Sequence, residues 1–120
     1  MTTPPLHFQT IFQISNLIKS RQISPVEVTT ELLERIDRLD CRLKSYTTVL
    51  ADQAMTAARK AEKEIISGVY RGRLHGIPIA VKDLCFTKGV HTMGGTKALA
   101  DHVPDFDSTV VERLELAGAV

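Results

Sequence analysis

The stretch Ile77–Asp83, which reads IPIAVKD, decides how this chain is expected to fold. Its apolar residues Ile77, Ile79 and Val81 alternate, which is typical of a short β-strand with one buried face. Pro78 has no backbone N–H, so it favours the beginning of a strand or an edge position. The sequence therefore predicts a buried strand over this stretch.

Helical patterns surround this predicted strand on both sides. Apolar residues recur at helical spacing over about 11–20, 25–39, 52–67 and 109–117. Ser24 stands three residues before Glu27, which predicts a capping box at the start of the second helix. We also expect Asp52 to cap the third helix, Ser108 or Thr109 to cap the last, and a short strand over 45–50.

The length allows one small domain and not two, because the chain has 120 residues. Two prolines make residues 1–9 a loose lead-in, and residues 10–120 read as part of a single domain. We expect an α/β fold, in which N-terminal helices pack on the start of a mixed β-sheet. The residues after Gly118 resemble the start of another buried strand, so this sheet is expected to be unfinished.

The composition is that of an ordinary globular protein and excludes several partner classes. The formal net charge is +1 and no run of basic residues occurs, so neither nucleic acid nor an acidic membrane is expected as partner. No apolar run approaches the roughly 20 residues of a membrane span. Cys41 and Cys85 fit neither a disulfide framework nor a C-x-x-C motif. Without a secretory signal at its start, the protein is expected to be cytoplasmic, with both thiols reduced.

Lys82 is the candidate site residue on the predicted strand. Its neighbours Val81 and Ala80 are apolar, and burial among such residues would favour a neutral amine, which is a competent general base. The alternative is a lysine at a strand end that extends into solvent or pairs with Asp83. Spacing alone favours this second interpretation.

The glycine-rich segment Thr92–Lys97 admits two interpretations as well. It could let a ligand approach the backbone closely, or it could simply reverse the chain between strand and helix. It is not a phosphate-binding loop, because Gly95 stands where that motif requires lysine. The histidines lack metal-ligand spacing, so no zinc site is expected, and His75 reads as a turn residue.

The serines provide no credible nucleophile. None of them stands in a glycine-rich elbow that would expose its hydroxyl beside backbone donors. Ser24 and Ser108 have the positions of helix caps, and the others lie at or near helix and strand ends. The sequence therefore offers a possible base without a partner nucleophile.

The ten residues Leu74–Asp83 (LHGIPIAVKD) closely resemble the lysine motif of the amidase-signature family. The similarity continues through Gly89, through Thr92–Leu99 and through Val103–Leu114. Upstream, Ser24–Val28 and its neighbouring helices are similar to the family's N-terminal helices. The resemblance thus covers about residues 10–120, which would be the N-terminal part of a truncated amidase domain with an incomplete amidase-signature fold.

This resemblance implies a function in amide hydrolysis by a Ser–cis-Ser–Lys triad. In that family a serine attacks the amide carbonyl, a second serine relays the proton, and the lysine is the ultimate base. Lys82 matches this lysine, whereas the family's two serines lie further along the chain than the residues present here. The resemblance implies a small-molecule amide substrate, bordered by Met93, Gly94 and Gly95, and neither metal nor organic cofactor. We expect these 120 residues alone to be inactive.

Two other interpretations remain open at this point. The chain could belong to the A subunit of a glutamine-dependent amidotransferase, which releases ammonia from glutamine. It could instead be a truncated non-catalytic module that binds a partner or associates with itself through an exposed sheet edge. The residues beyond Val120 would discriminate between these interpretations, and the sequence implies no particular oligomeric state.

Overall fold

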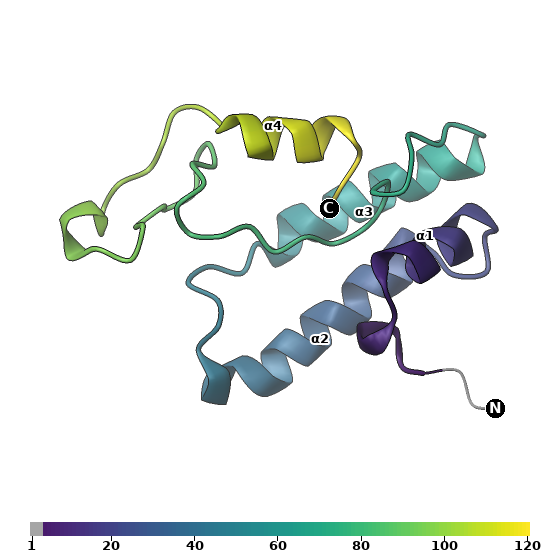
Figure 1. The fold of residues 1–120 in the computed structure, drawn as a ribbon, viewed down its shortest axis with the longest axis horizontal. Helices are drawn as coiled ribbons and strands as arrows, with labels where there is room; N and C mark the ends of the chain where they lie inside the picture. The colour runs from purple at the N-terminus through teal and green to yellow at the C-terminus, as the bar shows by residue number, and fades with distance from the viewer. Residues whose placement is uncertain (1–3) are drawn as a thin grey trace.

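A computed structural model describes residues 4–120 as a chain of helices joined by long loops (Figure 1). Residues 1–3 of the expected lead-in lie outside the described residues, and the remainder of that lead-in contains a short 3₁₀ turn. In chain order the elements are η1 (Leu6–Phe8), α1 (Ile11–Lys19), α2 (Pro25–Leu43), α3 (Ala51–Ile66), η2 (Lys97–Leu99) and α4 (Thr109–Leu116).

Helix α2 begins where the sequence predicted. The Ser24 hydroxyl accepts a hydrogen bond from the Glu27 N–H at 3.1 Å, and the Glu27 carboxylate accepts one from the Ser24 N–H at 2.7 Å. Pro25 occupies the first helical turn, where its missing N–H costs nothing. Thr10 and Gln13 form the same reciprocal cap on α1. Local side-chain hydrogen bonds therefore determine where α1 and α2 begin.

The core lies where α2 packs on α3, two helices that run side by side (Figure 1). Ala58 and Ala61 are buried on α3, where their small side chains allow close packing against a neighbouring segment. Gly76 approaches α2 so closely that an added Cβ would lie 2.5 Å from Pro25 Cγ. The main hydrophobic cluster comprises Ile14, Ile18, Val28, Ile65 and Ile77.

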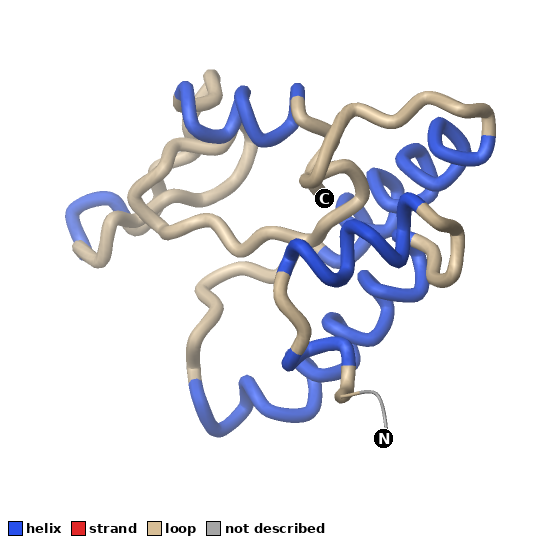
Figure 2. The backbone as a smooth tube through the Cα atoms, turned by 45° about the vertical axis from the view of Figure 1, so that its right-hand side comes forward, coloured by secondary structure: helices blue, strands red, loops and turns tan. Residues whose placement is uncertain are grey.

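The expected mixed β-sheet is absent, because residues 4–120 contain no β-strand (Figure 2). Residues 76–83 are an irregular segment with three backbone hydrogen bonds to the end of the chain: Gly76 N–H to Gly118 O, Ile79 N–H to Val120 O, and Val120 N–H to Ile77 O. A strand needs a longer ladder of such bonds than these residues provide. The α/β prediction is therefore wrong for the described chain, which is helical.

The second expected strand, over 45–50, is also wrong. The N–H groups of Ser45 and Tyr46 donate to the Asp40 carboxylate at 2.6 and 3.3 Å, so they continue the end of α2 instead of pairing with another segment. Helix α3 then starts after Leu50, and Asp52 lies in its first turn instead of capping it.

Helix α4 begins at Thr109 after Ser108, but no side chain caps it. The Ser108 hydroxyl is buried without a hydrogen-bond partner among the described residues, so the cap expected from Ser108 or Thr109 does not form. Gly118 follows the helix with φ +80°, a left-handed conformation that suits glycine.

The described chain is flat and open. Its principal extents are 48 × 32 × 21 Å, and its radius of gyration of 15.2 Å exceeds the about 14 Å typical of a compact domain of this length. Residues 84–107 form a long loop that projects away from α2 and α3 (Figure 1). No helix between residues 4 and 120 is long and apolar enough to cross a membrane.

Candidate functional site

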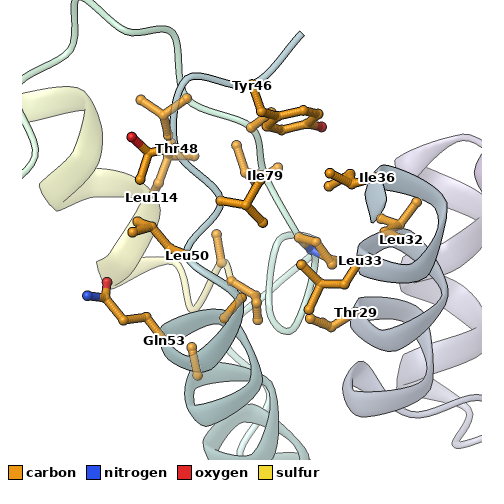
Figure 3. Close-up of a pocket in the computed structure, with 18 of the residues that line it drawn as sticks. Thr29, Leu32, Leu33, Ile36, Tyr46, Thr48, Leu50, Gln53, Ile79 and Leu114 are labelled. Atoms are coloured by element: carbon orange, nitrogen blue, oxygen red, sulfur yellow. The ribbon is translucent and has the colours of Figure 1, made fainter. Parts of the chain in front are cut away.

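A cavity of about 740 Å³ opens between α2 and the segments that follow it (Figure 3). Leu33 and Ile36 of α2 form one wall, and Ile79 faces them from the irregular segment. Leu50 and Leu114 contribute to the far side. Apolar side chains therefore form most of the cavity wall, and Lys82 and Asp83 are the polar residues on it that the sequence singled out.

Lys82 lines this cavity, at the end of residues 77–83. Its carbonyl accepts hydrogen bonds from the N–H groups of Leu84 and Cys85 at 2.8 and 2.9 Å, which turns the chain tightly after the lysine. The side chain is exposed, and its amine forms neither a hydrogen bond nor an ion pair with residues 4–120. Of the two interpretations from the sequence, burial of the amine is not found in this chain, and the side chain extends into solvent instead of pairing with Asp83.

Asp83 joins Lys82 to the glycine-rich segment. Its carboxylate accepts a hydrogen bond from the Met93 N–H at 3.0 Å, and its backbone carbonyl accepts one from the Gly94 N–H at 2.7 Å. The structure thus brings together the two parts of the predicted site, Lys82 and Met93–Gly95, through a residue that sequence reasoning considered only as an ion-pair partner. The sequence signal that could have predicted this contact was an acidic residue next to the lysine and ahead of a glycine turn.

The segment from Thr92 to Thr96 is a well-defined turn. Gly94 and Gly95 have φ values of +58° and +73°, which L-residues adopt with strain. The Thr96 N–H donates to the Met93 carbonyl at 3.1 Å, and Thr92 is buried, with its N–H bonded to the His102 carbonyl. Both interpretations from the sequence are compatible with this geometry, because the turn reverses the chain while leaving the glycines exposed.

A second polar cluster lies at the start of the motif, where His75 is buried beneath Glu64 and Arg71. His75 Nε2 lies 2.9 Å from a Glu64 carboxylate oxygen, and the Arg71 N–H donates to His75 Nδ1 at 3.1 Å. Because Nδ1 accepts a hydrogen bond, the ring proton must be on Nε2, which donates to Glu64. Arg71 also binds Glu64 through two guanidinium hydrogen bonds of 2.7 and 3.0 Å.

These contacts shift two pKa values. Burial lowers the pKa of His75 below its usual 6.5, and this outweighs the opposing attraction of Glu64. The hydrogen bond from Arg71 is the main cause of the lowered pKa of Glu64, with His75 contributing in the same direction. The cluster therefore holds a neutral imidazole against an ionised carboxylate and fixes the turn that leads into 77–83.

Most of the serines have structural roles, and none of them is hydrogen-bonded to the Lys82 amine. The hydroxyls of Ser15, Ser20 and Ser67 each donate to the carbonyl three residues earlier. Ser45 borders the cavity but forms no side-chain hydrogen bond with the described residues. Between residues 4 and 120, no group of three or more His, Cys, Asp or Glu side chains is placed to hold a metal ion.

Comparison with known proteins gives consistent matches along most of the chain. The family model described as Amidase matches residues 27–120. AmiD of Mycobacterium tuberculosis, an amidase by name, is 49% identical over 90% of this chain and 23% of its own length. The A subunit of glutamyl-tRNA(Gln) amidotransferase from Moorella thermoacetica is 40% identical over 96% of this chain and 24% of its own.

Solved structures show the same arrangement of the backbone. The native peptide amidase from Stenotrophomonas maltophilia superposes with a TM-score of 0.88 and 31% identity, covering 97% of this chain and 24% of its own. A bacterial aryl acylamidase of the amidase signature family gives a TM-score of 0.87 at 28% identity. The chain spans about a quarter of the length of these relatives. Because the family match includes α2, the Lys82 motif, the glycine turn and α4, this chain belongs to the amidase family, as the resemblance to the amidase-signature motif predicted.

Proposed function

We propose that this chain is part of an amide-bond hydrolase in which Lys82 is the ultimate base and a serine from outside these residues is the nucleophile. The observation that carries the proposal is the position of Lys82 within a family match of 94 residues, beside a cavity that its side chain reaches without any competing ion pair. In the proposed enzyme, burial of this amine by residues outside the chain would favour the neutral form that can accept a proton.

The proposed reaction follows acyl transfer. The serine hydroxyl attacks the amide carbonyl carbon, and its proton passes through a second serine to the Lys82 amine. When the C–N bond breaks, that proton returns to the departing nitrogen, which leaves as ammonia or an amine. Water then cleaves the resulting ester, so that Lys82 ends in the protonation state in which it began.

Met93, Gly94 and Gly95 are proposed to border the bound amide. This is supported by the hydrogen bonds from the Met93 and Gly94 N–H groups to Asp83, because they hold the turn beside the residue that follows Lys82. The exposed glycines have no side chains that would block a ligand from their backbone. The substrate is proposed to be a small-molecule amide, and a cytoplasmic setting suits two cysteines that are both free thiols.

These residues alone are expected to be inactive, because no serine among them is hydrogen-bonded to Lys82. The test is therefore a chimera in which this chain replaces the matching quarter of AmiD from M. tuberculosis. We expect the chimera to release ammonia or amine from members of a panel of simple amides. Lys82→Ala should reduce kcat by roughly 10²–10⁴-fold, the usual contribution of general acid–base catalysis.

Two further variants make the test specific. Lys82→Arg retains the positive charge but cannot supply a neutral amine, so it should be as inactive as Lys82→Ala. Lys88→Ala removes another exposed lysine six residues away and should leave kcat unchanged. A folded chimera that keeps its activity after Lys82→Ala would refute the proposed role.

A second candidate function is the release of ammonia from glutamine, as the A subunit of an amidotransferase. The relative from M. thermoacetica bears this name and is 40% identical, so the same lysine motif could serve either reaction. The chimera on the AmiD scaffold cannot decide this, because most of the substrate pocket would come from AmiD. A second chimera on the M. thermoacetica protein, assayed for ammonia release from glutamine, tests whether this chain supports that reaction.

A further inference from the structure

The loop over residues 84–107, which projects from α2 and α3 in Figure 1, is closed by backbone hydrogen bonds at its neck and further out. At the neck, the Ser108 N–H donates to the Phe86 carbonyl at 2.8 Å. Further out, the Thr92 N–H donates to the His102 carbonyl at 3.1 Å. This second bond closes a smaller loop that contains the glycine turn, so the position of the turn depends on where His102 lies.

Phe86 is the central member of an aromatic cluster inside this loop. Its ring centroid lies 5.0 Å from that of His102 and 5.6 Å from that of Phe106, which it meets edge-on. Aromatic pairs at such separations attract each other beyond the effect of apolar burial alone. The Nε2 atom of His102 is buried without a hydrogen bond to any residue from 4 to 120. Packing on Phe86 therefore orients this imidazole, because that nitrogen has no hydrogen bond to do so.

His102 is connected to the glycine turn through two neighbours. Its carbonyl accepts the Thr92 N–H, which comes just before the turn, and its own N–H donates to the Leu99 carbonyl at 3.0 Å. The Leu99 side chain lies against the turn, since its Cδ1 atom is 4.0 Å from where a Cβ on Gly94 would be. On the other side, the Asp83 carbonyl accepts the Gly94 N–H at 2.7 Å. The turn is thus held between the residue that follows Lys82 and a segment that packs on Phe86.

We propose that Phe86 is a positioning residue for the proposed hydrolysis: by packing on His102, it holds the Met93–Gly95 turn where the amide binds. This role rests on the proposed function, because the turn borders the amide only in that reaction. The phenyl ring has no proton to exchange, so it takes no part in the proton transfer to Lys82. Loss of an interaction that binds substrate and transition state equally raises KM and leaves kcat unchanged. Phe86 should therefore act on KM.

The kinetic test uses the chimera on the AmiD scaffold, with a simple amide that the unmodified chimera hydrolyses. Phe86→Ala should raise KM roughly tenfold and change kcat by less than about twofold, because it removes both ring contacts. Phe86→Leu keeps most of the apolar volume, so it should fold normally and raise KM by a smaller factor. Phe8→Ala removes an exposed ring at the other end of the chain and should leave both constants unchanged.

A purely structural role of Phe86 predicts a different kinetic result. If the ring only stabilised the fold, its loss would reduce the amount of folded enzyme, so the measured kcat would fall while KM stayed the same. That result in both Phe86 variants would overturn the proposal. The route through His102 is tested by a double-mutant cycle, in which Phe86→Ala should raise KM less than about twofold once His102→Ala is present. Fully additive effects on KM would contradict that route.

Amide exchange in the full 120-residue chain tests the same packing without catalysis. Phe86→Ala should make the Thr92 and Gly94 amides exchange with solvent roughly tenfold faster, because their hydrogen bonds open more often. The Val28 amide in α2 should be unaffected. An inactive chimera would refute the hydrolase proposal, and faster exchange would then still support the hold of Phe86 on the turn. Unchanged exchange at both amides would refute the positioning role, even in an active chimera.

Discussion

The carboxylate of Asp83 accepts a hydrogen bond from the backbone N–H of Met93 across ten residues of chain, at 3.0 Å. Asp83 is the immediate neighbour of Lys82, so this bond fixes the glycine turn relative to the proposed base. A hydrogen bond to a charged acceptor that is partly exposed contributes about 1 kcal/mol to the local structure. The turn is therefore expected to depend measurably on this one side chain.

Asp83→Ala should make the Met93 amide exchange with solvent about fivefold faster, which corresponds to the loss of about 1 kcal/mol. Asp83→Asn keeps an acceptor oxygen and should have a smaller effect. Asp105→Ala removes an exposed acid without a hydrogen bond to the described residues and serves as the control. Amide exchange measured by NMR checks this, and unchanged exchange at Met93 in Asp83→Ala would show that the bond does not hold the turn.

Helix starts could be predicted from the sequence where local chemistry sets them. Ser24 and Glu27 are three residues apart, and their reciprocal bonds need nothing from the rest of the chain. A strand over 77–83 would need remote pairing partners, and within the described residues its remote backbone–backbone hydrogen bonds are limited to those with Val120 and Gly94. Alternation of apolar residues predicted a buried strand, but only Ile77 is buried and Val81 is exposed, because the pattern could not reveal how many neighbours the segment has.

Two serines at N-cap positions, Ser24, which caps its helix, and Ser108, which does not, give a matched pair of variants. Ser24→Ala should lower the free energy of unfolding by about 1 kcal/mol, because it removes the acceptor for the Glu27 N–H. Ser108→Ala should cost much less or even stabilise, because its buried hydroxyl has no partner among the described residues. Urea unfolding of both variants measures the difference. Equal losses would mean that Ser108 also caps its helix in solution.

Gly118 packs directly on His75, and the contribution of this contact to stability can be measured separately from that of backbone strain. An added Cβ at Gly118 would lie 2.5 Å from His75 Cδ2 and 3.1 Å from Arg71 Cδ, at φ +80°. Gly118→Ala should therefore destabilise by about 2–4 kcal/mol, from strain and overpacking together. Gly89→Ala, at φ +73° with nothing within 4 Å, should cost only about 1 kcal/mol. Urea unfolding compares them, and equal costs would argue against the close contact.

The functional site could be predicted in part. The lysine motif singled out Lys82 and the glycine turn as candidates, because a local pattern carries them, and their catalytic and binding roles stay predictions. The contact between His75 and Glu64 could not be predicted, since Glu64 lies on a helix eleven residues earlier and its orientation depends on how α3 packs. His75 was correctly expected in a turn, but its burial and its partner became visible only in three dimensions.

The free energy of unfolding is expected to decrease as the pH falls, because of His75 and its neighbours Glu64 and Arg71. Burial lowers the folded-state pKa of His75, so the unfolded chain binds a proton first as the pH falls through about 6.5. Stability is thus fully present above that pH and is lost as the pH falls towards the lower folded pKa. Glu64 adds a second loss below about pH 4.5, because Arg71 lowers its folded-state pKa as well.

Replacement of the histidine separates these two effects. His75→Gln cannot take up a proton, so the decline in urea midpoint between pH 7 and pH 5 should become shallower, while the loss below about pH 4.5 remains. His91→Gln, at an exposed histidine, should leave the whole profile unchanged. If the decline between pH 7 and pH 5 persists in His75→Gln, the buried imidazole is not its cause, and the proton must bind elsewhere in the unfolded chain.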